Sequence, residues 1–307
     1  MTWTSEVFGL RLEGDALGLG LAARDAASSG RPTVLRAVTR AELDANWPAG
    51  AVRLAEEHAE PGAAPRTIDE HPTAGWRLDA PGWGVARVAV DGTLVEGARD
   101  GAEAWRWQRF LVGRVLPFAA VASGLEVMHA AAVVVGGRAL ALTGTTGAGK
   151  SSVGAALAAR GHALLTDDVL ALELAGERVV AHPGPPVLAL RDPETAILGA
   201  AAVAALGRRT GAGGGKTYVE TPPAPGPCPL GRLVVLRRDP AASGLAVHEL
   251  PADPRLLLGS LFVPEAQPAG RAARHLSLLA VLARDVPCSE AVVGSGCTAA
   301  DVAEALA

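Results

Sequence analysis

The eight residues from Gly144 to Ser151, with the sequence GTTGAGKS, constrain this chain more than any other segment. They match the pattern G-x-x-x-x-G-K-[S/T] at every fixed position, between an apolar segment typical of a strand and an alanine-rich segment typical of a helix. Glycines in such a loop let backbone N–H groups converge on phosphate oxygens, and the helix N-terminus adds the positive end of its dipole. The pattern therefore predicts a phosphate-binding loop, in which Lys150 reaches the β- and γ-phosphates and the Ser151 hydroxyl binds Mg²⁺.

Two adjacent carboxylates follow this loop. Asp167 lies 17 residues after Lys150, and with Asp168 it stands at the end of an apolar strand. A parallel sheet would place that strand end beside the phosphate loop, where one carboxylate could hold Mg²⁺ while the other accepts a proton from an attacking hydroxyl. The alternative is a turn in which the aspartates cap backbone groups. We favour the functional interpretation, because two carboxylates flanking buried strands are costly without a cation.

One histidine precedes the loop. His129 lies 15 residues before Gly144 and is followed by two apolar segments, Ala131–Val135 and Arg138–Thr143, that predict a hairpin. A histidine before an apolar strand is most often a hydrogen-bonded core residue. The hairpin, however, brings His129 back toward the sheet edge from which the phosphate loop begins, so it is a candidate site residue.

Lysine is rare in this chain, since Lys150 and Lys216 are the only lysines among 28 basic residues. Lys216 ends the glycine-rich segment Gly211–Gly215, which predicts a flexible loop. Such a lysine can simply be a surface residue, but a cation on a glycine-rich hinge also suits a lid that closes on phosphates. We interpret Lys216 as a phosphate or substrate contact. Arg237 and Arg238 follow a buried strand and could also point to the site, but we favour solvated surface positions for both.

The composition excludes several classes of protein. A hydrophobic content of 49% argues against disorder, and a net charge of −4 without an arginine-rich block gives no nucleic-acid footprint. The three cysteines form no CxxC pair, which argues against a disulfide framework or a zinc site. No secretory signal is visible, and the longest apolar stretch, Val115–Val135, is interrupted by Glu126 and His129. We expect a soluble cytoplasmic protein with neither nucleic-acid nor membrane partners.

The aromatic residues divide the chain into two predicted domains. All six tryptophans lie within the first 107 residues, which indicates a separate packing unit over residues 1–120, followed by a second domain over residues 121–307. Within the first unit, Gly84–Val90 is typical of a strand, Asp91-Gly92 of a turn, and Ala102–Phe118 of a helix with an apolar stripe. We expect substrate specificity to arise partly in this Trp-rich α+β unit.

Several short segments together carry a resemblance to a known family. They are His129-Ala-Ala-Ala-Val-Val-Val, Gly136-Gly137, the loop from Gly144 to Ser152, Arg160-Gly161-His162 and Thr166-Asp167-Asp168. The chain here resembles the C-terminal catalytic domain of HPr kinase/phosphorylase, and more closely its stand-alone relatives, the HPr-kinase-like serine kinases of bacteria, some of which lie beside peptide natural-product genes. The resemblance is specific over residues 125–175 and weaker through Lys216 to Val286-Pro287.

The resemblance implies an α/β fold with a P-loop kinase core related to phosphoenolpyruvate carboxykinase. It also implies transfer of a phosphoryl group to a serine-type hydroxyl, with ATP and Mg²⁺ as cofactors. Asp168 would be the base, Asp167 together with Ser151 a magnesium contact, and His129 the electrostatic partner of the aspartates, although the two aspartate roles could be exchanged. The expected nucleotide contacts are Gly144, Thr145, Thr146, Gly147, Ala148, Gly149, Lys150, Ser151, Ser152 and Lys216.

The chain also departs from that family. It has no match to the Arg-Gly-Leu-Gly-type signature that follows the aspartate pair in true HPr kinases, and its N-terminal part does not resemble their regulatory domain. HPr itself is therefore not the expected substrate, and a reverse phosphorylase reaction is not expected. The favoured function is a kinase acting on a serine of a peptide or protein. The alternatives are a catalytically silent ATP-binding module or scaffold, and a small-molecule alcohol kinase of the same fold; the oligomeric state is left open, including a homo-oligomer.

Overall fold

A computed structural model describes residues 3–19, 21, 30–58, 64–213, 215–251 and 260–307. The chain has a mixed α/β structure and forms two compact units. The first comprises Met1–Val127 with Val263–Arg274, and the second comprises Met128–Phe262 with His275–Ala307. Nothing in the sequence pattern signals that the short segment of residues 263–274 belongs with the first unit.

The first unit is built on one eight-stranded sheet. Its strands are β1 (Trp3–Val7), β2 (Leu10–Gly14), β3 (Arg31–Ala37), β4 (Val52–Glu57), β5 (Arg66–His71), β6 (Gly75–Ala80), β7 (Gly84–Val88) and β8 (Leu94–Ala98). They lie in the order β1-β2-β3-β8-β7-β6-β5-β4, with β3 parallel to both of its neighbours and the other pairs antiparallel. The predicted Asp91-Gly92 turn joins β7 to β8, with Gly92 at a φ of +74°.

Helices complete this unit. A short helix, α1 (Arg40–Asn46), begins at a capping box of Thr39 and Glu42. The helix predicted over Ala102–Phe118 is formed by α2 (Ala104–Phe110), the π-helical turn η1 (Leu111–Val115) and α3 (Leu116–Ala122) in direct succession. Its expected apolar stripe is buried, and consists of Trp107, Phe110, Leu111, Val115 and Phe118.

The long helix fits the sheet through two glycines. A Cβ atom on Gly84 would lie 2.5 Å from the Trp107 ring, and one on Gly97 would lie 2.9 Å from it, so only glycine leaves room for the indole. Phe118, on the same long helix, contacts Trp76 of β6, with ring centroids 6.3 Å apart.

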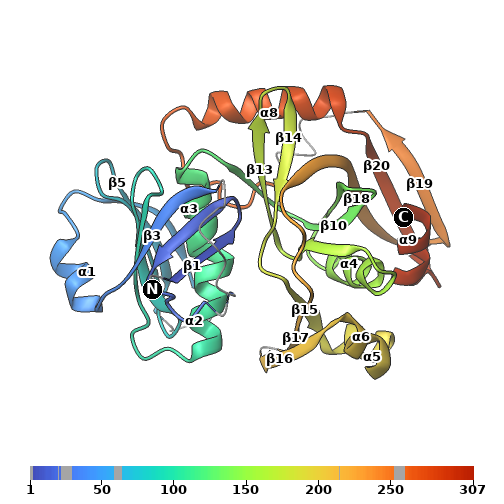
Figure 1. The fold of residues 1–307 in the computed structure, drawn as a ribbon, viewed down its shortest axis with the longest axis horizontal. Coiled ribbons are helices and arrows are strands. Elements are labelled where there is room, and N and C mark those ends of the chain that lie inside the picture. Colours follow the sequence, from blue (N-terminus) through green and yellow to red (C-terminus); the bar gives the residue numbers. More distant parts are fainter. Residues whose placement is uncertain (1–2, 20, 22–29, 59–63, 214, 252–259) are drawn as a thin grey trace. The chain divides into compact units, whose positions relative to one another are not determined.

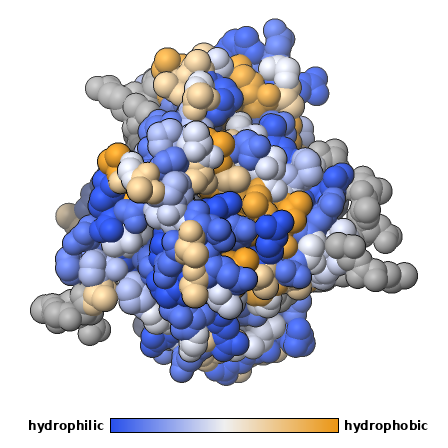
Figure 2. Space-filling view, turned by 90° about the vertical axis from the view of Figure 1, so that its left-hand side faces the viewer, coloured by the Kyte–Doolittle hydropathy of each residue, from blue (hydrophilic) through white to orange (hydrophobic). Residues whose placement is uncertain are grey.

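The face of the molecule drawn in Figure 2 is mostly hydrophilic, with small hydrophobic patches between the polar residues.

The second unit contains the larger mixed sheet. Along the chain its strands are β9 (Glu126–His129), β10 (Ala131–Val135), β11 (Arg138–Thr143), β12 (Ala163–Thr166), β13 (Val169–Ala175), β14 (Arg178–His182), β18 (Cys228–Ser243), β19 (Leu245–Leu250) and β20 (Cys288–Ser295). The order is β12-β10-β11-β18-β14-β13-β9, and β20 pairs with both β18 and β19. The predicted hairpin of β10 and β11 is confirmed.

The direction of β12 corrects one expectation. The strand that leads to the aspartate pair was expected in a parallel sheet, but β12 pairs with β10 in an antiparallel manner. Because β11 is antiparallel to β10 as well, β11 and β12 still run in the same direction. Their carboxyl ends, at Thr143 and Thr166, therefore meet at one edge of the sheet, as the site hypothesis requires.

Helices cover both faces of this sheet. The helices α4 (Lys150–Ala159) and α9 (Ala299–Leu306) pack on one face, and α8 (Arg271–Asp285) packs on the other through its second half (Figure 1). Leu140 and Leu142 face α4, while Ala139 and Ala141 face α8, which is the alternation of a strand buried on both sides. The helix α9 begins with a capping box of Thr298 and Asp301.

A small module follows the main hairpins. It comprises β15 (Val187–Arg191), α5 (Asp192–Leu198), α6 (Ala200–Leu206), β16 (Arg208–Gly213) and β17 (Lys216–Glu220), with the strands in the order β15-β17-β16. The flexible loop expected at Gly211–Gly215 is wrong for its first part, because Gly211–Gly213 pair with β17. Residue 214 lies outside the described residues, as do residues 252–259. The sequence pattern also predicts a helix over Pro254–Phe262, most of which falls in this second range. None of the helices in the described ranges is long and apolar enough to cross a membrane.

Candidate functional site

The loop from Gly144 to Gly149 joins β11 to α4 and lies against the middle of β18, at Leu236 and Arg238. Gly144 has a φ of +140°, and a Cβ atom there would lie 2.4 Å from the carbonyl oxygen of Leu236. Gly147 and Gly149 also have positive φ values, of +86° and +103°. The two fixed glycines of the motif are therefore required by backbone conformation and, at Gly144, by the close approach of a neighbouring strand.

Lys150 is the first residue of α4, and it is buried with 7% of its surface exposed. Its ammonium group donates to the carbonyl oxygens of Gly144, at 2.8 Å, and Thr145, at 3.4 Å, both in its own loop. Burial lowers the pKa of Lys150, while the charges of Asp168 and Asp167 act in the opposite direction. The loop thus encloses a positive charge that has only neutral oxygens as hydrogen-bond partners among the described residues.

Asp167 is also buried, with 7% exposed, directly after β12. Its Oδ2 atom accepts a hydrogen bond of 2.8 Å from the backbone N–H of Ala189 in β15, whereas Oδ1 is buried and has no hydrogen-bond partner in the described part of the chain. Burial raises the pKa of Asp167 to about 6. The Ala189 amide, the nearby Ser151 hydroxyl and the charge of Lys216 offset this only in part, and Asp168 raises the pKa further.

Asp168 differs from its neighbour because its side chain is 57% exposed. His129, at the end of β9, brings its Nδ1 atom within 3.2 Å of the Asp168 carboxylate and 3.1 Å of the Asp168 backbone oxygen. The imidazole stacks on the Phe262 ring, with ring centroids 5.9 Å apart. The backbone N–H of His129 donates to the backbone carbonyl oxygen of Ser260 at 2.8 Å. The histidine is therefore fixed on two sides and faces an accessible carboxylate.

Two other residues that the sequence indicated have different surroundings. The Ser152 hydroxyl donates to Glu194 Oε1 at 2.8 Å, and the same glutamate caps the start of α5 by accepting from the Arg191 N–H at 2.7 Å. Ser152 thus links α4 to α5, and its contact with phosphate stays a prediction. Lys216 begins β17 opposite Arg191, close enough to Asp167 for its charge to lower the pKa of that carboxyl.

Sequence reasoning missed two groups at this site and favoured a surface position for a third. The Ala189 N–H is a backbone donor and leaves no trace in the sequence, and Glu194 lies in an ordinary helix start. Arg238 was interpreted as a surface residue, but a guanidinium nitrogen of Arg238 lies 3.2 Å from the position of a Cβ atom on Gly149. The buried residue Leu236 provides a signal for it, because residues two apart on a strand share a face and Leu236 packs with α4.

The residues present fit a nucleotide phosphate chain with a divalent cation. A buried carboxylate oxygen without a partner, on Asp167, lies near the Ser151 hydroxyl, and Lys150 has a buried ammonium group next to an exposed loop. No group of three or more His, Cys, Asp or Glu side chains that could hold a metal occurs in the described ranges. Mg²⁺ is usually bound by one or two carboxylates together with substrate phosphates and water, and Asp167 with Ser151 could supply the protein part of such a set.

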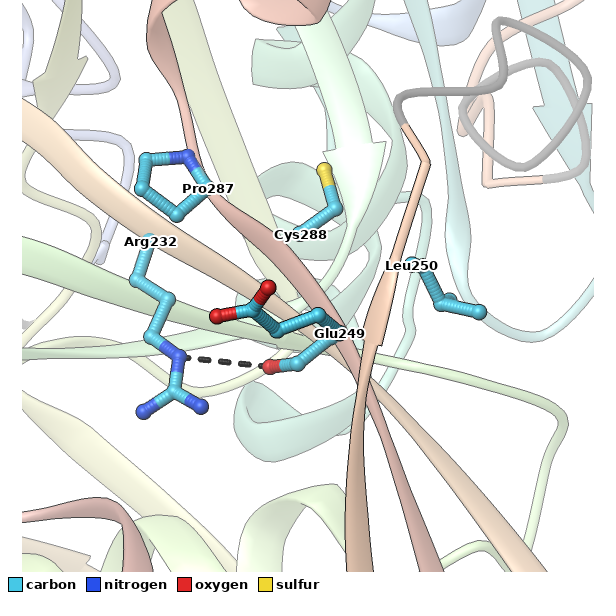
Figure 3. A pocket seen from close by; sticks show the side chains of 6 residues that line it. Arg232, Glu249, Leu250, Pro287 and Cys288 are labelled. Carbon is cyan, nitrogen blue, oxygen red and sulfur yellow. Dashed lines mark hydrogen bonds between the residues drawn. The ribbon is translucent and has the colours of Figure 1, made fainter.

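A pocket of about 370 Å³ lies elsewhere in this unit (Figure 3). Its lining comes from β18, β19 and the start of β20, and consists of Arg232, Glu249, Leu250, Pro287, Cys288 and Ser289. Arg232 Nε donates to the Ser289 hydroxyl at 3.2 Å. Arg232 pairs with Leu140 early in β11, whereas the phosphate loop follows Thr143. The pocket is thus at the amino-terminal end of these parallel strands, and ligands of open α/β sheets bind at the carboxyl ends.

Comparison with known proteins gives distant structural similarities. No family model matches the chain, and no curated protein matches it in sequence. The chain is similar to the solved structure of the Hpr(Ser) kinase/phosphatase from Coxiella burnetii, with a TM-score of 0.30 and 14% identity, covering 56% of this chain and 87% of that chain. A similarity this distant carries no argument about activity, so the function has to be inferred from the residues of the site.

Proposed function

We propose that this protein is an ATP- and Mg²⁺-dependent kinase that transfers the γ-phosphoryl group to a hydroxyl, most specifically a serine hydroxyl of a peptide or protein. The observation that carries the proposal is the contrast between two adjacent carboxylates beside the phosphate loop. Asp167 is buried with one oxygen lacking a partner, whereas Asp168 is accessible and paired with His129. A kinase needs one carboxylate for a cation and a second for a proton, and each environment suits one of these roles.

The residues of the loop would bind the phosphates. The backbone N–H groups of Gly144 to Gly149 and the ammonium group of Lys150 supply positive charge, with Lys216 as an additional cation near Asp167. Asp167 and Ser151 would hold Mg²⁺, which when bound neutralises charge on the phosphate oxygens. Deprotonated Asp167 is the form that binds a cation, and a bound cation would lower its raised pKa.

Asp168 is the proposed base. Its carboxylate accepts the proton of the acceptor hydroxyl as the hydroxyl oxygen forms a bond to the γ-phosphorus and the bond from that phosphorus to the bridging oxygen breaks, so that ADP leaves. His129 Nδ1 lies 3.2 Å from this carboxylate and holds it in place. The stacked Phe262 ring restricts the imidazole. The accessible position of Asp168 supports this assignment, since an incoming hydroxyl has to reach the base within hydrogen-bond distance.

The test is a pair of variants of the full chain. Purified protein with γ-labelled Mg-ATP and a pool of serine-containing peptides should give phosphopeptides, detected by mass spectrometry. Asp168→Asn should lower turnover about 10²- to 10⁴-fold, the range for removal of a general base, with nucleotide affinity nearly unchanged. Lys150→Ala should instead weaken nucleotide binding as well as transfer, because it removes the buried cation of the loop.

Asp285→Asn is the matched control, since this aspartate pairs with Arg284 at the exposed end of α8. It should leave turnover unchanged. Full turnover in Asp168→Asn would show that the base is assigned wrongly. Tight Mg-ATP binding by calorimetry without transfer to peptides or small alcohols would identify the silent binding module, and transfer to small alcohols alone would identify a small-molecule kinase.

A further inference from the structure

We propose that Arg238 is a second cation for the nucleotide phosphates, acting beside Lys150 at the phosphate loop. This inference rests on the proposed nucleotide-binding function and adds a residue outside the sequence motif. It would make the middle of β18 part of the binding site.

The register of the sheet positions Arg238. Strands β11 and β18 are parallel, and Thr143, the last residue of β11, pairs with Val235. The phosphate loop therefore begins where β18 continues through Leu236 to Arg238. A Cβ atom placed on Gly144 would lie 2.4 Å from the Leu236 carbonyl oxygen, so the loop approaches β18 closely there. A Cβ atom placed on Gly149 would lie 3.2 Å from a guanidinium nitrogen of Arg238.

The face of the strand fixes the direction of approach. Leu236 belongs to the core that contains α4, and Arg238 lies two residues later, so both are on the face of β18 that carries the phosphate loop. Gly149 is the N-cap of α4, where backbone N–H groups without helical partners already favour an anion. Because Gly149 has no side chain, the guanidinium can lie against this part of the backbone.

The two adjacent arginines of β18 differ in their partners. Arg237 is held by carboxylates, donating to Glu290 at 2.9 Å and to Asp239 at 3.1 Å. Arg238 is exposed, and its guanidinium takes part in none of the hydrogen bonds and ion pairs within the described ranges. A guanidinium that lies against a phosphate loop without a counter-ion can bind phosphate oxygens in a bidentate manner without first losing another partner.

The experiment compares Arg238→Ala with Arg237→Ala by calorimetry on the full chain. Arg238→Ala should weaken binding of Mg-ATP about 10- to 30-fold, as expected for lost hydrogen bonds to a charged group. It should weaken binding of inorganic tripolyphosphate by a similar factor, because the proposed contact is to phosphate. Arg237→Ala should change neither affinity by more than about twofold, since exposed ion pairs contribute little. Arg238→Lys should retain part of the affinity through its charge.

The outcomes separate this proposal from the proposed function. If wild type binds Mg-ATP and Lys150→Ala loses it, but Arg238→Ala behaves like Arg237→Ala, the role of Arg238 is overturned and the nucleotide site stands. If Arg238→Ala weakens Mg-ATP but not tripolyphosphate, the arginine contacts the base or sugar and the phosphate assignment is overturned. If wild type does not bind Mg-ATP, the proposed function fails and this inference fails with it. Thermal unfolding of both variants checks that each is folded, and Arg238→Gln provides a second neutral variant.

Discussion

Each of the two units buries two charged side chains, and the units differ in how completely those side chains are paired with hydrogen-bonding or oppositely charged groups. In the first unit, Arg271 and Glu126 are both 4% exposed and form an ion pair of 3.0 Å. Arg271 also donates to the carbonyl oxygens of Val263 and Ala266. In the second unit, Lys150 and Asp167 are each 7% exposed, yet they do not bond to each other, and one oxygen of Asp167 has no hydrogen-bond partner among the residues described.

This difference distinguishes a buried ion pair that stabilises the fold from buried charges that suit the binding of a ligand. A buried ion pair whose hydrogen-bonding groups are satisfied holds its surroundings together, because removing one partner leaves the other charge buried alone. Buried charges without complete partners lower the stability of the free protein and are retained where a ligand completes them. The comparison therefore places Glu126 and Arg271 in the packing of the first unit, and it supports the binding role that we propose for Lys150 and Asp167.

The largest expected effect concerns the paired charges. Arg271→Ala should lower the free energy of unfolding by about 3–5 kcal/mol, because it leaves Glu126 buried without its partner. Lys150→Met should change stability much less, since burial already lowers the pKa of Lys150 and an apolar side chain of similar length removes the buried charge. Urea unfolding of both variants without ligand tests the contrast.

Glu126→Leu combined with Arg271→Met is the control for the first of these effects. The double variant should recover much of the stability lost in Arg271→Ala, since it removes both buried charges together. If Lys150→Met destabilises the protein as strongly as Arg271→Ala, the contrast between the paired charges of the first unit and the incompletely paired charges of the second is wrong.

Local sequence patterns were enough to predict the secondary structure at the centre of the candidate site. The Gly144–Ser151 motif requires a strand, a loop and a helix in that order, and the Gly136-Gly137 turn predicts the preceding hairpin. These features depend on neighbouring residues, so they can be inferred locally. The positions of His129 and Asp168 follow from the same hairpin and strand, and the two side chains do lie together.

Contacts between distant segments were not predictable in this way. The glycine-rich segment before Lys216 has the composition of a loop, but Gly211–Gly213 form a strand because β17 pairs with them. The Ala189 N–H reaches Asp167 through β15, and a backbone donor has no sequence signature. Arg238 could have been found from strand alternation after Leu236, whereas Glu194 could not, since its role depends on where α5 packs against α4.

The second prediction concerns the pH dependence of stability. Burial raises the pKa of Asp167 from 3.8 to about 6 in the folded protein, so the folded state holds this proton more tightly than the unfolded state does. The resulting destabilisation is absent below pH 4, grows as the pH rises to 6 and is complete above it. A shift of about two pKa units corresponds to about 3 kcal/mol.

Asp167→Asn removes this titration. Measured without nucleotide or Mg²⁺, the free energy of unfolding of the variant minus that of wild type should therefore increase by about 3 kcal/mol between pH 4 and pH 7, because only wild type is destabilised over this range. Urea unfolding across this pH range gives the difference directly. A difference that stays constant with pH would mean that the Asp167 carboxylate is not destabilised by burial, and Asp167 would then resemble the paired charges of the first unit.

The smallest expected effect concerns a residue that could serve either the stability of the fold or the binding of nucleotide. Ser152 was expected to contact nucleotide, but its hydroxyl donates to Glu194 at 2.8 Å and is thus already paired. Ser152→Ala should lower stability by about 1 kcal/mol, the usual contribution of such a hydrogen bond, and should leave Mg-ATP affinity nearly unchanged. Glu194→Gln measured alone and together with Ser152→Ala gives the coupling between the two side chains. Strong coupling in stability with unchanged affinity would make Ser152 a structural residue like Arg271, whereas weaker nucleotide binding without coupling would return it to the phosphate site.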